Sequence, residues 1–103
     1  MRVKWTKKAL ASLEKETEYI RKNNIQASQK VVSHIKNSVK GLSDNPYMGR
    51  ECVYETRELI NPSYPFIVWY EVTKDSVNIL LVKHMASNFD YEYKLGFIEN
   101  TDD

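Results

Sequence analysis

Cysteine is almost absent from this sequence, because Cys52 is the only one among 103 residues. A single thiol excludes an internal disulfide and fits a reducing compartment, so we predict a cytoplasmic protein. Only His34 and His84 could join Cys52 as soft metal ligands, which is too few for a dedicated zinc site. We therefore expect no metal and no cofactor, and we expect Cys52 to be a half-buried strand residue without a catalytic role.

Long hydrophobic runs and a charge excess of either sign are also missing. The longest apolar stretch, around residues 79–82, has the length of a strand and is too short to cross a bilayer. The basic N-terminus lacks the continuous apolar segment of a signal peptide, so no membrane association is expected. The net charge is only +1, with 15 basic and 14 acidic residues. Proteins that bind nucleic-acid phosphates usually carry a clear basic excess, which this chain as a whole lacks.

The first part of the chain has the pattern of a short strand followed by a helix. Residues 3–5 alternate in polarity, and Thr6 stands where a helix N-cap is expected. Apolar residues at helical spacing predict a helix over residues 7–23: Leu10, Leu13 and Ile20, with Thr17 between them. Asn23 and Asn24 tolerate left-handed backbone, and we expect them to end this helix.

A second helix is predicted over residues 26–42. Its apolar positions form one stripe: Ala27, Val31, Val32, Ile35, Val39 and Leu42. Because only a few residues connect the two helices, we expect an antiparallel hairpin whose two stripes share a core. His34 lies beside the stripe, at the surface or rim of the helix.

The second half of the chain has the pattern of a sheet. Turn-forming residues predict a loop over residues 43–50. Three β-type segments follow, over residues 52–60, 66–72 and 77–83, and their short connections predict an antiparallel meander whose middle strand is central. A strand, a helical hairpin and then a mainly antiparallel sheet make an α+β fold. We predict one domain over residues 1–95 and a frayed acidic tail over residues 96–103.

Four segments of this half, taken in order, resemble a known family. They are L-S-D-N-P-Y-M-G-R from Leu42, T-R-E-L from Thr56, Y-P-F-I-V-W-Y-E-V from Tyr64 and V-N-I-L-L-V-K-H from Val77. Their order and spacing resemble the ParE-like branch of the RelE/ParE toxin superfamily, and the resemblance extends over residues 3–89.

The resemblance implies a function that composition alone could not. It implies the toxin of a bacterial type II toxin–antitoxin (plasmid stabilisation) system, held by a cognate antitoxin in a hetero-oligomer. The ParE branch inhibits DNA gyrase, whereas the RelE branch cleaves messenger RNA on the ribosome. A third alternative is a degenerate member that only binds its antitoxin.

Four residues are candidates for the functional site. If the chain is a metal-independent nuclease, the resemblance implies Arg57, Glu58 and His84 as catalytic groups, because RNA cleavage needs a cation, a base and an acid. If it acts by binding, Arg50, Arg57 and His84 are the expected contacts with a partner or target. Arg57 and Glu58 are neighbours on a strand, so their side chains should point to opposite faces, and one of them could pair with a charge on the helices.

One departure from the nuclease pattern favours the non-enzymatic alternative. RelE-type nucleases carry on the middle strand an arginine that acts on the scissile phosphate, and the matching position here is Ile67. A tyrosine found after the last strand in some nucleases is replaced by Met85. Together with the low net charge, these differences favour a ParE-like gyrase inhibitor over a ribosome-dependent nuclease.

Overall fold

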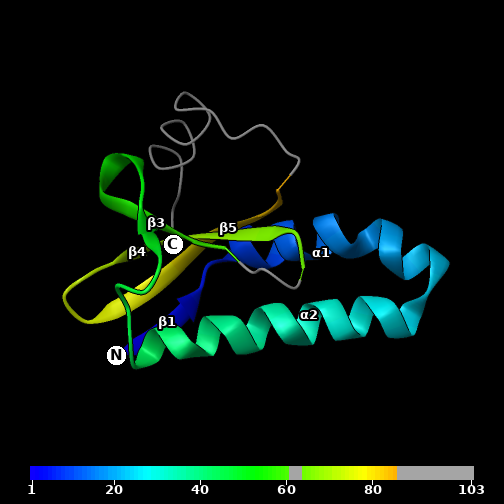
Figure 1. Ribbon diagram of the computed structural model, residues 1–103, viewed down its shortest axis with the longest axis horizontal. Coiled ribbons are helices and arrows are strands. Elements are labelled where there is room, and N and C mark those ends of the chain that lie inside the picture. Colours follow the sequence, from blue (N-terminus) through cyan, green and yellow to red (C-terminus); the bar gives the residue numbers. More distant parts are fainter. Residues whose placement is uncertain (61–63, 86–103) are drawn as a thin grey trace.

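Two helices pack on one face of a five-stranded sheet in the computed structural model, which describes residues 1–60 and 64–85 (Figure 1). The predicted α+β fold is therefore confirmed. The elements in chain order are β1 (Arg2–Trp5), α1 (Lys7–Asn23), α2 (Ile25–Lys40), η1 (Gly41–Ser43), β2 (Arg50–Glu51), η2 (Val53–Glu55), β3 (Thr56–Ile60), β4 (Phe66–Val72) and β5 (Ser76–His84). None of the helices in these residues is long and apolar enough to cross a membrane. The predicted domain end at residue 95 and the acidic tail lie outside the described residues.

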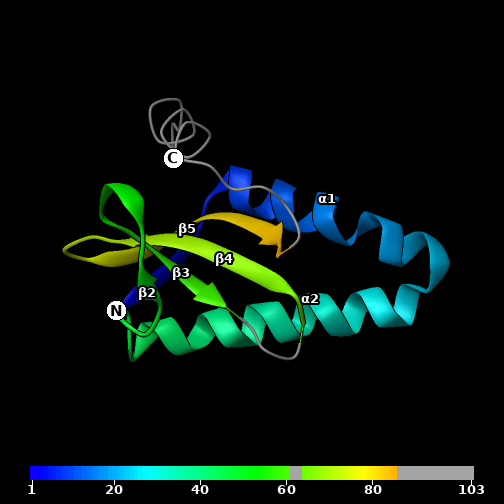
Figure 2. The same cartoon turned by 45° about the horizontal axis from the view of Figure 1, so that its top comes forward.

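The strand order is β1-β5-β4-β3-β2, so β4 is central, as predicted (Figure 2). The strands β2 to β5 pair antiparallel, whereas β1 pairs parallel with β5. Both faces of β4 contain buried side chains. Phe66, Val68 and Tyr70 belong to the main core with residues of α1 and α2, and Trp69 belongs to a smaller cluster with Leu80 and Leu81.

The two helices are capped by residues that also make other contacts. The Thr6 hydroxyl accepts a hydrogen bond from Ala9 N–H at 3.1 Å and donates one to the Ile79 carbonyl at 2.7 Å, which ties the start of α1 to β5. Asn24 serves both helices, because its N–H donates to the Ile20 carbonyl and its Oδ1 accepts from Ala27 N–H. Its φ of −160° is extended, so the expected left-handed helix end is wrong.

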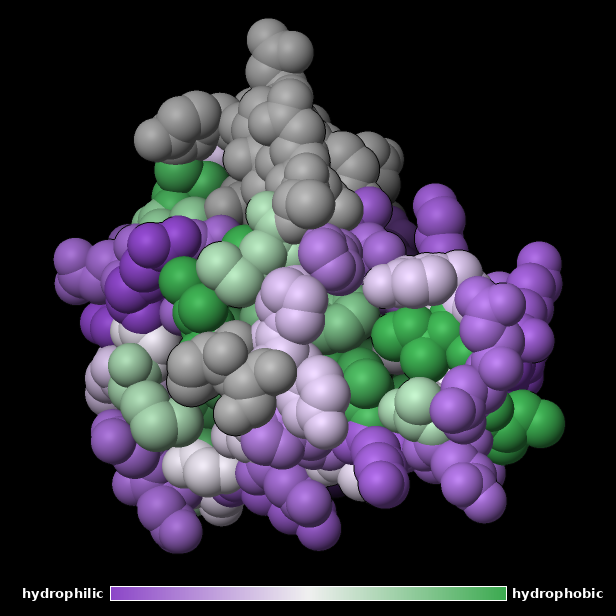
Figure 3. Space-filling view, turned by 45° about the vertical axis from the view of Figure 1, so that its right-hand side comes forward, coloured by the Kyte–Doolittle hydropathy of each residue, from purple (hydrophilic) through white to green (hydrophobic). Residues whose placement is uncertain are grey.

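The apolar stripes of the helices are buried or half-buried with one exception. On α2 the buried residues include Val31, Ile35 and Val39, and Leu42 is buried just beyond the helix, in η1 rather than in the predicted helix end. On α1 the sheet-facing residues include Ala9 and Leu13, whereas Leu10 is 44% exposed, so its predicted core position is wrong. Seen from the hairpin side, apolar side chains gather between the hydrophilic surfaces of the two helices (Figure 3).

The predicted strand over residues 52–60 begins only at Thr56, because η2 occupies residues 53–55, and the short strand β2 precedes this turn at residues 50–51. In this turn Tyr54 and Glu55 have positive φ angles of 55° and 59°, as consecutive residues of type I′ hairpin turns do. Turns of this kind usually contain Asn-Gly, so the Tyr-Glu sequence does not predict this turn. Cys52 is half-buried as predicted, but it lies between β2 and η2 and not in a strand.

Candidate functional site

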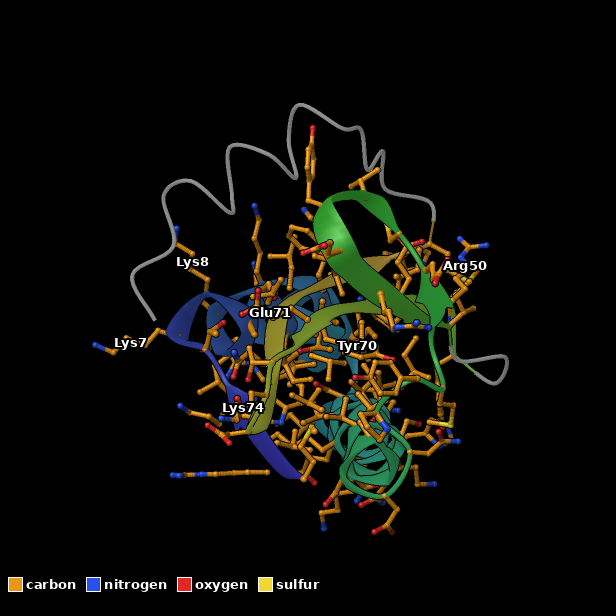
Figure 4. All side chains as sticks on the ribbon, turned by 90° about the vertical axis from the view of Figure 1, so that its left-hand side faces the viewer. Lys7, Lys8, Arg50, Tyr70, Glu71 and Lys74 are labelled. Carbon is orange, nitrogen blue, oxygen red and sulfur yellow. The ribbon has the colours of Figure 1, made fainter. Side chains whose placement is uncertain are left out.

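The loop before β2 is anchored to the sheet by one buried tyrosine. The Tyr70 hydroxyl donates a hydrogen bond to the Pro46 carbonyl and accepts one from Gly49 N–H, both at 2.9 Å. Burial raises the pKa of Tyr70 above 10.0, and the Gly49 N–H and the Arg57 charge only partly offset this effect. The hydroxyl is thus neutral at physiological pH and holds the loop in place. Figure 4 shows Tyr70 in the interior and Arg50 at the rim.

Gly49 fits this loop because no side chain could occupy its position. A Cβ atom there would lie 2.6 Å from the Tyr70 hydroxyl oxygen and 2.8 Å from the Glu58 carbonyl oxygen. The turn pattern predicts Gly49 only as a turn former, and Tyr70 was not among the residues predicted to have a role. The feature that could have indicated this anchoring role is a tyrosine in a predicted central strand, since a buried tyrosine hydroxyl needs a hydrogen-bond partner.

Arg57 holds the same loop from β3. Its guanidinium donates to the carbonyls of Gly49 at 2.7 Å and Tyr47 at 3.2 Å, and it lies 5.0 Å from the centroid of the Tyr47 ring. Its other terminal nitrogen is 3.5 Å from the Glu51 carboxylate. These contacts use most of the donors of the guanidinium and hold the loop against β3.

Arg50 and Glu58 form a second pair on the opposite face of the β2–β3 hairpin. Two guanidinium nitrogens of Arg50 lie 3.1 and 3.2 Å from one Glu58 carboxylate oxygen. Arg50 is in β2 rather than in the predicted loop, and its side chain is 63% exposed, whereas that of Glu58 is 9% exposed. The prediction that Arg57 and Glu58 face opposite sides agrees with this pairing. The charged helix residue that was predicted as a partner takes no part in these two ion pairs. Each pair joins one residue of β2 to one residue of β3.

His84 lies far from these residues. It ends β5 as predicted, and its ring packs edge-on against Phe66 with the centroids 5.3 Å apart. His84 pairs with Phe66 on β4, whereas Arg57 pairs with Tyr70. The two positions are thus separated by about 13 Å along the strands and about 10 Å across them. Arg57 and His84 do not converge on one substrate atom, and Glu58 lies on the other face.

The position of the missing nuclease arginine contains no cation. Ile67 is half-buried on β4 and lies opposite Ile60 and Lys83 in the two neighbouring strands. The Lys83 ammonium is 3.5 Å from the Glu16 carboxylate on α1, so this nearby cation is already in an ion pair. His34 packs edge-on against Tyr64 at 4.7 Å between ring centroids, which agrees with the predicted rim position.

Comparisons with known proteins agree with this fold. Residues 3–89 match the family model described as "ParE toxin of type II toxin-antitoxin system, parDE". A protein of Sinorhizobium fredii (strain NBRC 101917 / NGR234) named "Putative toxin Y4kP" is 37% identical over 84 residues, which cover 81% of this chain and 86% of that protein. A chain of the solved structure "Chromosomal ParDE TA system from P. aeruginosa" is 26% identical with a TM-score of 0.73, and the match covers 82% of this chain and 95% of that chain. The chain therefore belongs to the ParE toxin family of type II toxin–antitoxin systems.

Proposed function

We propose that this toxin inhibits DNA gyrase by binding to it, and that a cognate antitoxin neutralises it in a hetero-oligomer. The observation that carries the proposal is the dispersal of the candidate catalytic groups. Metal-independent RNA cleavage needs a base, an acid and a cation within hydrogen-bond reach of one phosphate. Here Arg57 orders a loop, Glu58 is paired on the opposite face, and His84 lies at the other end of the sheet. This arrangement supports docking over chemistry.

The middle strand supports the same conclusion. Ile67 supplies no charge at the place where a nuclease of this superfamily is expected to hold the scissile phosphate. The loss of one donor to a transition state typically costs about 3 kcal/mol, or roughly a hundredfold in rate. Lys83, the cation beside Ile67, would have to leave Glu16 to replace it.

Arg50 is the best candidate for a contact with the target, because its guanidinium is both charged and exposed. We expect Arg50→Gln to weaken gyrase inhibition by about tenfold, as the loss of a charged contact at an interface does. Lys22→Gln removes the same charge from the exposed surface of α1 and is the matched control, which should inhibit like the unaltered toxin.

The deciding experiment combines a supercoiling assay on purified gyrase with pulse-labelling of cells that express the toxin alone. We expect supercoiling to stop and the DNA-damage response to begin while protein synthesis at first continues. Addition of the product of the neighbouring reading frame, as antitoxin, should restore supercoiling. Prompt loss of translation, with messenger RNA cut only when ribosomes are present, would refute the proposal and establish a nuclease. Growth without any defect would leave a member that only binds its antitoxin.

A further inference from the structure

The turn at the tip of the β2–β3 hairpin (residues 50–60) has a backbone that suits other residues than its own. Tyr54 and Glu55 have φ angles of 55° and 59°, and the Thr56 N–H donates to the Val53 carbonyl, as in a type I′ turn. In this left-handed region the backbone crowds the Cβ of a side chain, less so for asparagine and not at all for glycine. The Tyr-Glu sequence therefore makes the turn less stable than Asn-Gly would.

Contacts with the central strand hold the turn in this conformation. The buried Trp69 indole N–H donates to the Thr56 hydroxyl at 2.6 Å, and that hydroxyl donates to the Val53 carbonyl. The Cys52 N–H donates to the Thr56 carbonyl at 2.9 Å. Unfavourable backbone conformations persist where the surrounding structure enforces them, and they are concentrated at binding and catalytic sites. The tip of the hairpin is thus held in one conformation by the sheet behind it.

The Tyr54 side chain contributes little to the fold that holds it. It is 46% exposed, and among residues 1–60 and 64–85 it takes part in no hydrogen bond and no ring pair. The hairpin projects from the sheet on the side away from α2 (Figure 1 and Figure 2). Neither packing nor backbone preference explains a large aromatic side chain on this projecting turn. A contact outside the chain does explain it.

The exposed residues near the tip have the composition of a protein interface. Tyr47 and Met48, in the loop before β2, are 61% and 47% exposed, and the side chain of Arg50 is 63% exposed. Tyrosine, methionine and arginine are enriched in protein–protein interfaces, and tyrosine and arginine are frequent among the residues that dominate binding. From Arg50 to Tyr54 the chain extends over at most about 14 Å, so both residues fit within one interface of roughly 800 Å² per partner.

The charge of the hairpin favours a protein partner over a nucleic acid. Residues 50–60 contain two arginines and three glutamates, a net charge of −1. Arg50 pairs with Glu58 and Arg57 pairs with Glu51, whereas Glu55, at the tip, is in neither pair. A carboxylate at the tip repels phosphate groups, and both arginines already lie beside carboxylates. A phosphate backbone therefore fits this surface poorly.

We propose that Tyr54 is the residue that anchors the toxin on the protein surface of gyrase. Its ring would enter an apolar pocket that ends in a polar group for the hydroxyl. The inference rests on the gyrase inhibition proposed above, and it adds the anchoring residue and the loss of stability that its presentation on a left-handed turn requires. Replacement of Tyr54 should therefore change the stability of the toxin and its inhibition of gyrase in opposite directions.

The test replaces Tyr54 by asparagine, which tolerates left-handed backbone. We expect the Tm of Tyr54→Asn to rise by about 3–6 °C, and we expect supercoiling by purified gyrase to be inhibited only at toxin concentrations at least about tenfold higher. Tyr19→Asn makes the same change at a side chain that is 56% exposed on α1, and this matched control should inhibit within about twofold of the unaltered toxin.

Two further variants separate the ring from the turn. Tyr54→Phe keeps the ring and loses only the hydroxyl, so its inhibition should stay within about threefold of that of the unaltered toxin. Glu55→Gly makes the turn more favourable without changing Tyr54, so it should raise Tm and also inhibit within about threefold.

Each other outcome rejects the inference in a different way. Inhibition by Tyr54→Asn at the concentration of the unaltered toxin would leave the proposed function intact and place the contact elsewhere. A lower Tm for Tyr54→Asn would show that the tyrosine serves the fold. Loss of antitoxin binding with full inhibition would assign the tip to the antitoxin, and binding to duplex DNA that is lost in Tyr54→Asn would assign it to nucleic acid. If the unaltered toxin does not inhibit gyrase, the proposed function itself is wrong, and this inference falls with it.

Discussion

Replacement of Tyr70 by phenylalanine isolates the contribution of a single buried oxygen atom. The ring of Tyr70 is 0% exposed, and its hydroxyl connects the Pro46 carbonyl with the Gly49 N–H. Tyr70→Phe keeps the ring and its packing but removes both hydrogen bonds. The variant therefore tests whether this hydroxyl holds the loop against the sheet.

The cost follows from the groups that are left without partners. Each lost hydrogen bond costs about 1 kcal/mol, and a buried N–H without a partner costs roughly 1–3 kcal/mol. Gly49 is buried, whereas Pro46 is partly open to water, which can replace the hydroxyl at its carbonyl. We expect the free energy of unfolding to fall by about 2–3 kcal/mol. Small domains are stable by only roughly 5–15 kcal/mol, so Tm should fall by about 10–20 °C.

Urea unfolding followed by tryptophan fluorescence measures this change. The slope with urea should stay constant, since the variant buries the same surface. Tyr19→Phe is the matched control, because the Tyr19 side chain is 56% exposed on α1 and should contribute almost nothing. A Tyr70→Phe protein within about 0.5 kcal/mol of the unaltered toxin would refute the reasoning, because changes that small are typical of surface substitutions.

Three other predictions concern the same region. Gly49→Ala should lower the free energy of unfolding by about 1–3 kcal/mol in the same urea assay, because the added Cβ would collide with Tyr70. Gly41→Ala is the control, since its Cβ would meet only the flexible end of Met48 at 3.6 Å. Because the pKa of Tyr70 is raised in the folded state, the unfolded chain loses this proton first, and the free energy of unfolding should fall as pH rises past about 10. In a series of thermal melts at increasing pH, Tyr70→Phe should flatten that decline. An unchanged slope would contradict the assignment to Tyr70. Cys52→Ala should leave toxicity intact in a growth assay, and a folded but harmless variant would overturn the structural role of this thiol.

The elements that could be predicted are those with a repeated pattern. The helices and the strands β4 and β5 each carry apolar residues at one spacing over many positions, so a few residues that depart from the pattern do not obscure it. The turn at Tyr54 and Glu55 has no such repetition, and its residues are not those that favour positive φ. Leu10 fits the helical spacing equally well, and only the placement of α1 on the sheet decides that it faces outward.

The candidate site could be predicted in its residues but not in its contacts. The alternation along β3 already placed Arg57 and Glu58 on opposite faces. Their partners, Glu51 and Arg50, depend on the β2–β3 hairpin, which the sequence did not reveal. The hydrogen bond between Gly49 and Tyr70 joins residues 21 positions apart, and no local sequence pattern predicts a contact between residues so far apart.

The shared cap at Asn24 has a consequence for how the toxin opens. Fraying of the end of α1 releases the N–H bond to Ile20, and fraying of the start of α2 releases the side-chain bond from Ala27, so movement of Asn24 disturbs both ends at once. The amides around this residue should therefore exchange with solvent deuterium in one cooperative step, with a common opening free energy. Asn24→Ala removes the side-chain cap of α2 and should therefore speed exchange by the same factor at the end of α1 and at the start of α2. The two helix ends at this turn should therefore behave as one cooperative unit and not as two ends that fray independently.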